Sequence, residues 1–171
     1  MEPSIPEPTC DEPTAELDIP TWQLYVDGSS NDQYSGAGVI LVSLEGHKFH
    51  IAVKFGFTAS NNEAEYEALL AGLRLARTVQ ARAITVFSDS LLMVNQVLGE
   101  YQARGFKMMA YLSKVKDSLA QFDRYSIQHV PREKNSNADA LAKLASTKET
   151  ESLGIIPVEH LSDPSIKGEE T

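Results

Sequence analysis

Cysteine, catalytic-serine motifs and phosphate-binding glycine loops are scarce or missing in this sequence. Its 171 residues include a single cysteine, Cys10, which excludes an internal disulfide and lies in an acidic, proline-rich segment typical of a tail. No Gly-x-Ser-x-Gly elbow, P-loop or Gly-x-Gly-x-x-Gly motif follows a strand-like segment. The histidines show no metal-binding spacing with cysteine; they are His47, His50, His129 and His160. Cysteine or serine nucleophiles and P-loop nucleotide binding are therefore poor explanations of the chain.

Long apolar runs are also missing. The N-terminus lacks a basic region followed by an apolar stretch, so the sequence predicts no signal peptide. No apolar run is long enough to cross a bilayer. We therefore expect an intracellular protein, in the cytoplasm or the nucleus, without a membrane partner.

Basic charge is scarce, and the formal net charge is −9. The acids are concentrated at the two ends of the chain: residues 1–20 carry six acids and no lysine or arginine, and residues 148–171 carry six acids and two lysines. Residues 21–147 consequently have a net charge of +1. We predict an acidic, proline-rich linker at 1–20, one domain at 21–147, and an acidic linker tail at 148–171.

Apolar periodicity within 21–147 predicts an α/β domain. The first three strand patterns follow one another with short connections, as in an antiparallel meander, and the later strands alternate with helices. We expect a mixed five-stranded sheet, with two parallel strands beside the meander and helices on both faces. The predicted strands are 22–27, 36–43, 47–57, 83–87 and 125–130, and the predicted helices are 63–77, 91–98, 107–122 and 138–146.

Four acidic residues stand at informative places, although each has an ordinary explanation. Asp27 ends the first strand, where it could simply start a turn, and Asp89 follows a buried strand, where it could cap the next helix. Asp139 lies in the first turn of the last helix, where the helix dipole favours any acid. Glu65 is harder to explain, because it shares the apolar stripe of its helix with Leu69 and a buried carboxylate needs a partner.

The neighbours of Glu65 receive a different interpretation. Glu63 and Glu67 fall on other faces of the same helix, and we expect both to be solvated there. Asn61 and Asn62 precede this helix and are predicted to cap its N-terminus.

The four acids become more informative when they are considered together. If the first and fourth strands pair in parallel, Asp27 and Asp89 meet at the carboxyl edge of the sheet, where α/β proteins place their functional crevice. Glu65 and Asp139 could point into the same crevice. Four carboxylates in a small volume need compensation, and all-oxygen ligation favours Mg²⁺ or Mn²⁺. Two such ions about 4 Å apart suit in-line phosphoryl displacement.

These residues lie in motifs that resemble the four motifs of ribonuclease H type 1. The motifs are Tyr-Val-Asp-Gly-Ser at Asp27, Asn-Asn-Glu-Ala-Glu-Tyr at Glu65, Ser-Asp-Ser at Asp89 and Asn-Ala-Asp-Ala-Leu-Ala at Asp139. The resemblance covers about residues 21–147, and the four motifs occur in order. Within that family the chain looks most similar to the ribonuclease H region of plant gypsy-class retrotransposon polyproteins, which are reverse transcriptase-like.

The resemblance implies a ribonuclease H-like fold and a metal-dependent endonuclease that cuts the RNA strand of RNA–DNA hybrids. It implies that Asp27, Glu65, Asp89 and Asp139 hold two Mg²⁺ ions, with Mn²⁺ as a substitute. It also implies nucleic-acid contacts from Gly28, Ser29, Asn61, Asn62, Ser90 and Arg132, in addition to capping by the two asparagines. The tail Ile156-Pro-Val-Glu159 resembles a link to an integrase domain, and a reverse transcriptase domain is the other expected covalent partner.

The sequence departs from the family pattern at three places. Residues 131–137 contain no histidine of the kind that many members carry in this loop, and Arg132 or Glu133 is expected to serve instead. Leu91 stands where many members have a glutamine that touches nucleic acid. A basic protrusion is missing, since residues 99–107 offer only Arg104 and Lys107.

Two other functions remain open on the sequence. One is a catalytically silent ribonuclease H-like module that binds nucleic acid, although retention of all four acids argues against it. The other is a DNA-cutting two-metal nuclease on the same fold, against which the paired asparagines before Glu65 favour a hybrid substrate.

Overall fold

The computed structural model describes residues 19–30, 35–145 and 158–166. Most of the predicted linker at 1–20 and parts of the predicted tail at 148–171 lie outside these ranges. Within the described ranges, no helix is both long enough and apolar enough to cross a membrane.

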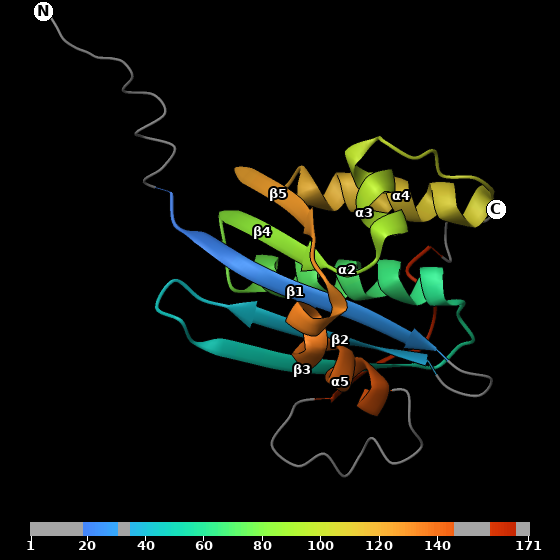
Figure 1. The fold of residues 1–171 in the computed structure, drawn as a ribbon, viewed down its shortest axis with the longest axis horizontal. Helices are drawn as coiled ribbons and strands as arrows, with labels where there is room; N and C mark the ends of the chain where they lie inside the picture. The colour runs from blue at the N-terminus through green and yellow to red at the C-terminus, as the bar shows by residue number, and fades with distance from the viewer. Residues whose placement is uncertain (1–18, 31–34, 146–157, 167–171) are drawn as a thin grey trace, which may run out of the picture.

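A single twisted sheet forms the centre of the molecule, with strand order β5-β4-β1-β2-β3-β6 (Figure 1). The predicted meander is confirmed, because β1 pairs antiparallel with β2 and β2 pairs antiparallel with β3. The predicted parallel strands are confirmed as well, with β4 beside β1 and β5 beside β4. The strands are β1 Thr21–Ser30, β2 Ser35–Val42, β3 Lys48–Phe55, β4 Ala83–Ser88, β5 Arg124–His129 and β6 Val158–Leu161.

The prediction of five strands is wrong by one. β6 pairs in parallel with the outer edge of β3, in a register that places Phe55 opposite Leu161. A four-residue edge strand is held by backbone hydrogen bonds and needs no long alternation of apolar residues. Because residues 148–171 are acidic and show no such alternation, the sequence predicted a linker there and not β6.

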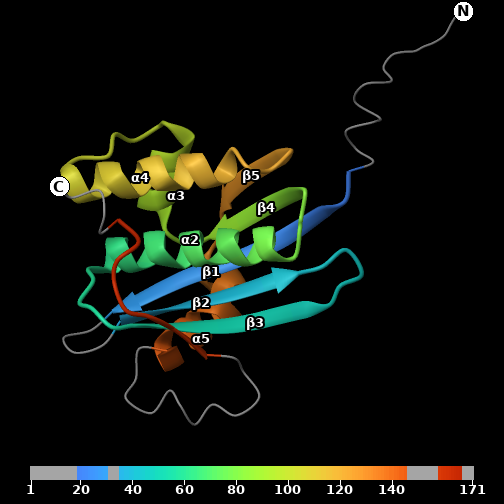
Figure 2. The ribbon, with the colours of Figure 1, turned by 180° about the vertical axis from the view of Figure 1, so that it is seen from behind.

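Helices cover both faces of the sheet, as predicted. Figure 2 shows α2 lying across one face with α4 alongside it, while α5 lies against the opposite face in Figure 1. The helices are α2 Asn61–Thr78, α3 Leu91–Leu98, α4 Phe106–Leu119 and α5 Ser136–Ala145, and a short 3₁₀ helix, η2 Arg132–Asn135, precedes α5. The predicted bounds agree with these to within about three residues.

The main core fills the space between α2 and the sheet. Leu24 and Val26 of β1 and Leu69 and Leu73 of α2 are fully buried there. Gly72 permits this contact, because a Cβ at that position would lie 2.8 Å from a methyl of Leu24. The apolar stripe predicted for α2 therefore faces the sheet, and it fixes which way the rest of the helix points.

The start of α2 differs from the prediction at two points. Ser60 is the N-cap, not Asn61 or Asn62: its hydroxyl accepts from the Glu63 N–H at 3.1 Å, and the Glu63 carboxylate accepts from the Ser60 N–H at 2.9 Å. This reciprocal pair is a capping box, which the Ser-x-x-Glu spacing signals. Glu67 is only 1% exposed, so the expectation that solvent surrounds it is wrong.

Candidate metal centre

Parallel pairing of β1 and β4 brings two of the predicted ligands together. The register sets Val26 opposite Ser88, so Asp27 and Asp89 follow at the same edge of the sheet. Asp27 is 3% exposed, and the Asp89 side chain is 5% exposed. The expectation that parallel pairing would bring these acids together agrees with the geometry, although β1 does not end at Asp27 but continues, paired with β2, to Ser30.

Glu65 enters the same site from α2 because the helix touches the end of β1 directly. A Cβ on Gly28 would lie 2.3 Å from the backbone carbon of Ala64, so only glycine allows this approach. The Gly28 N–H donates to Oε1 of Glu65 at 3.0 Å. The glycine after Asp27 thus both admits α2 and orients the third carboxylate.

Carboxylate oxygens of Asp27, Glu65 and Asp89 all lie within 4.8 Å of one another. Asp139, in the first turn of α5, approaches from the other face and makes a side-chain hydrogen bond with Asp27. The structure therefore brings all four predicted acids to one place, with three in a tight group and Asp139 joined through Asp27.

Burial and mutual repulsion favour protonation in this group. Burial, followed by the negative charge of Glu65, raises the pKa of Asp27 from its ordinary value of 3.8 to about 9. Burial also raises the pKa of Glu65 from 4.5 to about 7, although the hydrogen bond from Gly28 acts in the opposite direction. Carboxyl groups with raised pKa values in a cluster are typical of a site whose charge is meant to be balanced by something bound there.

A divalent cation fits the donors that are present. Oδ2 of Asp89 is buried without a hydrogen-bond partner in the described part of the chain, and Nε of Arg132 lies 3.9 Å from it. Arg132 has a side chain that is 76% exposed and is a weak counter-charge for four acids. An unpartnered buried oxygen beside two more carboxylates matches the hard, all-oxygen ligation of Mg²⁺ or Mn²⁺.

The predicted nucleic-acid contacts occupy several different environments. Asn61 and Asn62 are exposed at the start of α2, and Oδ1 of Asn61 accepts from the Ser30 hydroxyl at 2.7 Å. Ser90, rather than Asp89, caps α3, because its hydroxyl accepts from the Met93 N–H at 3.2 Å. Ser29 is half-buried in β1. The Gly28 N–H donates to Glu65, and the predicted contact of Gly28 with nucleic acid stays a prediction.

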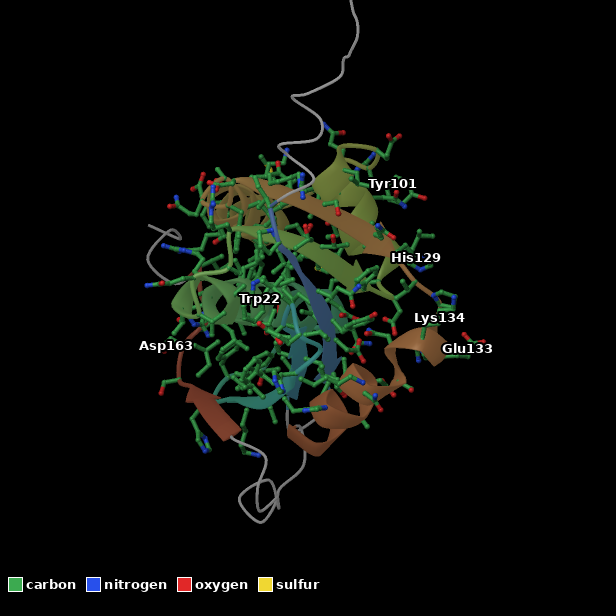
Figure 3. All side chains as sticks on the ribbon, turned by 90° about the vertical axis from the view of Figure 1, so that its left-hand side faces the viewer. Trp22, Tyr101, His129, Glu133, Lys134 and Asp163 are labelled. Atoms are coloured by element: carbon green, nitrogen blue, oxygen red, sulfur yellow. The ribbon has the colours of Figure 1, made fainter. Side chains whose placement is uncertain are left out.

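The positions where the sequence departs from the family pattern are accessible. His129 is the last residue of β5, as the predicted strand 125–130 implied, and its side chain is exposed (Figure 3). Leu91, at the start of α3, is 51% exposed. Arg132 and Glu133 lie in η2 and are exposed beside the site.

A groove that no sequence pattern predicted lies next to the site. It lies between the starts of α2 and α4, has a volume of about 610 Å³, and is lined by Ser60, Asn62, Arg104 and Lys107 among others. Nζ of Lys107 lies 3.8 Å from a carboxylate oxygen of Glu63. Phe106, 57% exposed at the groove, is a large apolar residue within a polar stretch, and that contrast was the available signal.

Comparison with known proteins adds independent information. The family described as reverse transcriptase-like matches residues 25–145 of the chain. A curated relative, Ribonuclease HI of Halobacterium salinarum, is 36% identical over 126 residues, which cover 71% of this chain and 62% of the relative. The chain thus spans less than two thirds of that relative's length.

Solved structures resemble the fold. The crystal structure of RNase H1 from Halobacterium salinarum aligns with a TM-score of 0.66 and 32% identity, covering 73% of this chain and 96% of that one. LC11-RNase H1, isolated from compost and solved in complex with an RNA/DNA hybrid, aligns with a TM-score of 0.62 and 26% identity, covering 71% of this chain and 94% of that one.

Proposed function

Because the chain belongs to the reverse transcriptase-like family of ribonuclease H type 1 proteins, we propose that it is a metal-dependent endonuclease that hydrolyses the RNA strand of RNA–DNA hybrids. One observation carries the proposal: Asp27, Glu65 and Asp89 place their oxygens within 4.8 Å of one another. The buried, unpartnered Oδ2 of Asp89 supports cation binding there. The LC11 relative, solved with a hybrid, supports the substrate class.

In this proposal Asp27, Glu65, Asp89 and Asp139 hold two Mg²⁺ ions, or Mn²⁺ in their place. When bound, the ions supply charge stabilisation for an in-line attack of water on the phosphodiester. The chain contributes the geometry. The Gly28 N–H orients Glu65, while Asp27 lies within β1 and Asp89 directly follows β4. Such fixed placement is what keeps reacting groups aligned.

Substrate recognition follows from the surface around the carboxylates. The exposed amides of Asn61 and Asn62 stand at the start of α2, where polar side chains can read a ribose 2′-OH in the minor groove. The other proposed contacts with the hybrid are Ser29, Ser90 and Arg132, which lie near the carboxylates at the same edge of the sheet. The groove with Arg104 and Lys107 offers cations to phosphates of the partner strand.

The wider context of the domain is also a proposal. We place it in reverse transcription of a retroelement, in the cytoplasm or nucleus, with reverse transcriptase and integrase domains covalently linked to it. The reverse transcriptase-like description of its family supports this context. Residues 21–147 are the proposed catalytic domain, and the described part of the tail packs onto it through β6.

A cleavage assay tests the proposal against its alternatives. Labelled RNA–DNA hybrid, duplex RNA and duplex DNA are each incubated with the full chain in Mg²⁺, Mn²⁺ or EDTA. We expect cuts in the RNA strand of the hybrid alone, in either metal and not in EDTA. Cleavage of duplex DNA would identify a DNA nuclease instead, and binding of hybrid without cleavage in either metal would identify a silent binding module.

A further inference from the structure

Three consecutive side chains near the start of α2 bind three different parts of the molecule. Oε1 of Glu65 accepts from the Gly28 N–H of β1, and the Tyr66 hydroxyl donates to Oε1 of Gln96 in α3 at 2.5 Å. Glu67 binds α4 and the C-terminal segment. Successive residues on a helix point about 100° apart, so these bonds leave α2 in different directions.

Glu67 is the buried junction of this arrangement. Its Oε2 accepts from the Tyr111 hydroxyl of α4 at 2.6 Å and from the Ser165 N–H at 2.8 Å. Its Oε1 accepts from the Ser165 hydroxyl at 2.6 Å. The side chain is 1% exposed, so three donors satisfy a carboxylate that water does not reach.

The C-terminal segment 158–166, which we call the strap, reaches this junction from the sheet edge. β6 pairs with β3, and the Gly56 N–H donates to the Leu161 carbonyl at 2.7 Å. Ile166 is 1% exposed within the main core. Figure 2 shows the strap, in red, running from beside β3 to the start of α2. The strap lies beyond residues 25–145, which are the part shared with the family.

The strap and the carboxylate cluster act on α2 from different sides. Glu65 and Glu67 are two residues apart and therefore about 200° apart around the helix axis. Figure 3 shows Asp163 of the strap on the side of the sheet that carries α2, and Glu133 and Lys134 of η2 on the opposite side. Repulsion within the cluster tends to displace Glu65, and the Glu67 bonds oppose that displacement in addition to the core packing of α2.

We propose that Glu67 and Ser165 are positioning residues, through which the strap adds to the core packing of α2 and holds the helix at the rotation that brings Glu65 to Asp27 and Asp89. This inference rests on the proposed function only in treating these three carboxylates as a cation site. Glu67 bonds to Tyr111 and Ser165, and neither Glu67 nor Ser165 belongs to the carboxylate group of Asp27, Glu65 and Asp89. Their effect passes through the helix to Glu65.

The first test measures Mn²⁺ binding to the full chain by calorimetry. Ser165→Ala removes the hydroxyl donor and is expected to raise the Kd for Mn²⁺ about fivefold, in the range of ordinary coupling between sites. Tyr111→Phe removes one donor from the same junction and is expected to shift the Kd in the same direction. Leu119→Ala is the matched control, because it destabilises a buried part of α4 without touching Glu67.

A conservative substitution separates geometry from charge. In Glu67→Gln the amide oxygen still accepts from Tyr111 and the Ser165 N–H, and the amide nitrogen donates to the Ser165 hydroxyl. The Kd for Mn²⁺ is therefore expected to stay near the wild-type value in Glu67→Gln and to rise in Glu67→Ala. Equal Kd values in Ser165→Ala, Tyr111→Phe and wild type, with only a lower Tm, would overturn the positioning role.

A metal-free measurement distinguishes this inference from the proposed function. Amide hydrogen exchange across residues 64–69, relative to the rest of the core, is expected to accelerate in Ser165→Ala and in Tyr111→Phe, whereas Leu119→Ala is expected to accelerate exchange without this local excess. If wild-type protein fails to cleave hybrid while these exchange and Mn²⁺ effects appear, the ribonuclease proposal fails and the strap inference stands. Unchanged exchange in both junction variants would overturn the inference, whatever the cleavage assay gives.

Discussion

Glu65 and Glu67 are the same residue type, two positions apart on one helix, and the structure gives them opposite surroundings. Glu65 lies among three other acids, accepts one backbone hydrogen bond, and has its pKa raised to about 7 by burial. Glu67 is more deeply buried, at 1% exposed, but accepts three hydrogen bonds from Tyr111 and Ser165. A buried carboxylate with its donors supplied stabilises a fold, whereas one crowded by like charges prepares a cation site.

The largest expected effect lies on the Glu65 side of this comparison. Asp89→Asn should lower hybrid cleavage by about 10²- to 10³-fold, in line with losing a main electrostatic contribution to the transition state. The fold should survive, because Ser90 and not Asp89 caps α3. Hybrid affinity should change little, since phosphate and minor-groove contacts supply it. Single-turnover cleavage and filter binding measure the two effects.

The control for Asp89→Asn is the same substitution at an exposed acid. Asp123 pairs with Arg82 at 2.7 Å, has a half-exposed side chain, and lies in the turn before β5. Asp123→Asn should leave cleavage unchanged. The two-metal assignment would be falsified if Asp89→Asn cleaved hybrid at the wild-type rate in Mg²⁺.

Substitutions at Glu67 should change the free energy of unfolding more than substitutions at Glu65. Glu67→Ala removes the acceptor of the buried Tyr111 hydroxyl and of the half-buried Ser165 donors, and is expected to lower the free energy of unfolding by about 3 kcal/mol. Glu65→Gln should change the metal-free value by less than about 1 kcal/mol and in the stabilising direction, because it removes repulsion. Urea denaturation in EDTA measures both, and a larger loss in Glu65→Gln than in Glu67→Ala would contradict the contrast.

The sequence predicted which acids lie together better than it predicted the buried contacts that hold α2 in place. Asp27 and Asp89 could be placed because apolar strand patterns end at both residues, and Glu65 because its stripe was apolar. Glu67 could not be placed, because its donors come from Tyr111 and Ser165, which lie 44 and 98 residues away in the sequence. β6 escaped prediction for the same reason: an edge strand is specified by the backbone of its neighbour. Contacts distant in sequence leave no local periodicity to detect.

Metal should stabilise the folded state through the Glu65 side alone. A ligand that binds only the folded form adds about 2.7 kcal/mol at a concentration 100 times its Kd. Millimolar Mg²⁺ or Mn²⁺ should therefore raise the Tm of the wild-type protein, measured by calorimetry against an EDTA sample. Asp27→Asn should raise the Tm in EDTA by relieving repulsion and should shrink the response to metal. A Tm that changes neither with metal nor in Asp27→Asn would argue against a clustered site.

The smallest expected effect is a pH slope in the metal-free protein. The pKa of Asp27 is raised from 3.8 to about 9, so between these values the folded state holds a proton that the unfolded chain has released. Stability from this group is complete below the lower value, falls as pH rises, and is lost above the upper one. One such proton gives a loss of about 1.4 kcal/mol per pH unit. Urea titrations in EDTA at pH 6 and pH 7 should show this decrease in wild type and a smaller one in Asp27→Asn. Glu67→Gln leaves the cluster intact and should keep the wild-type pH dependence of stability. If the pH dependence vanished in Glu67→Gln, the titrating group would be at the Glu67 junction and not in the carboxylate cluster.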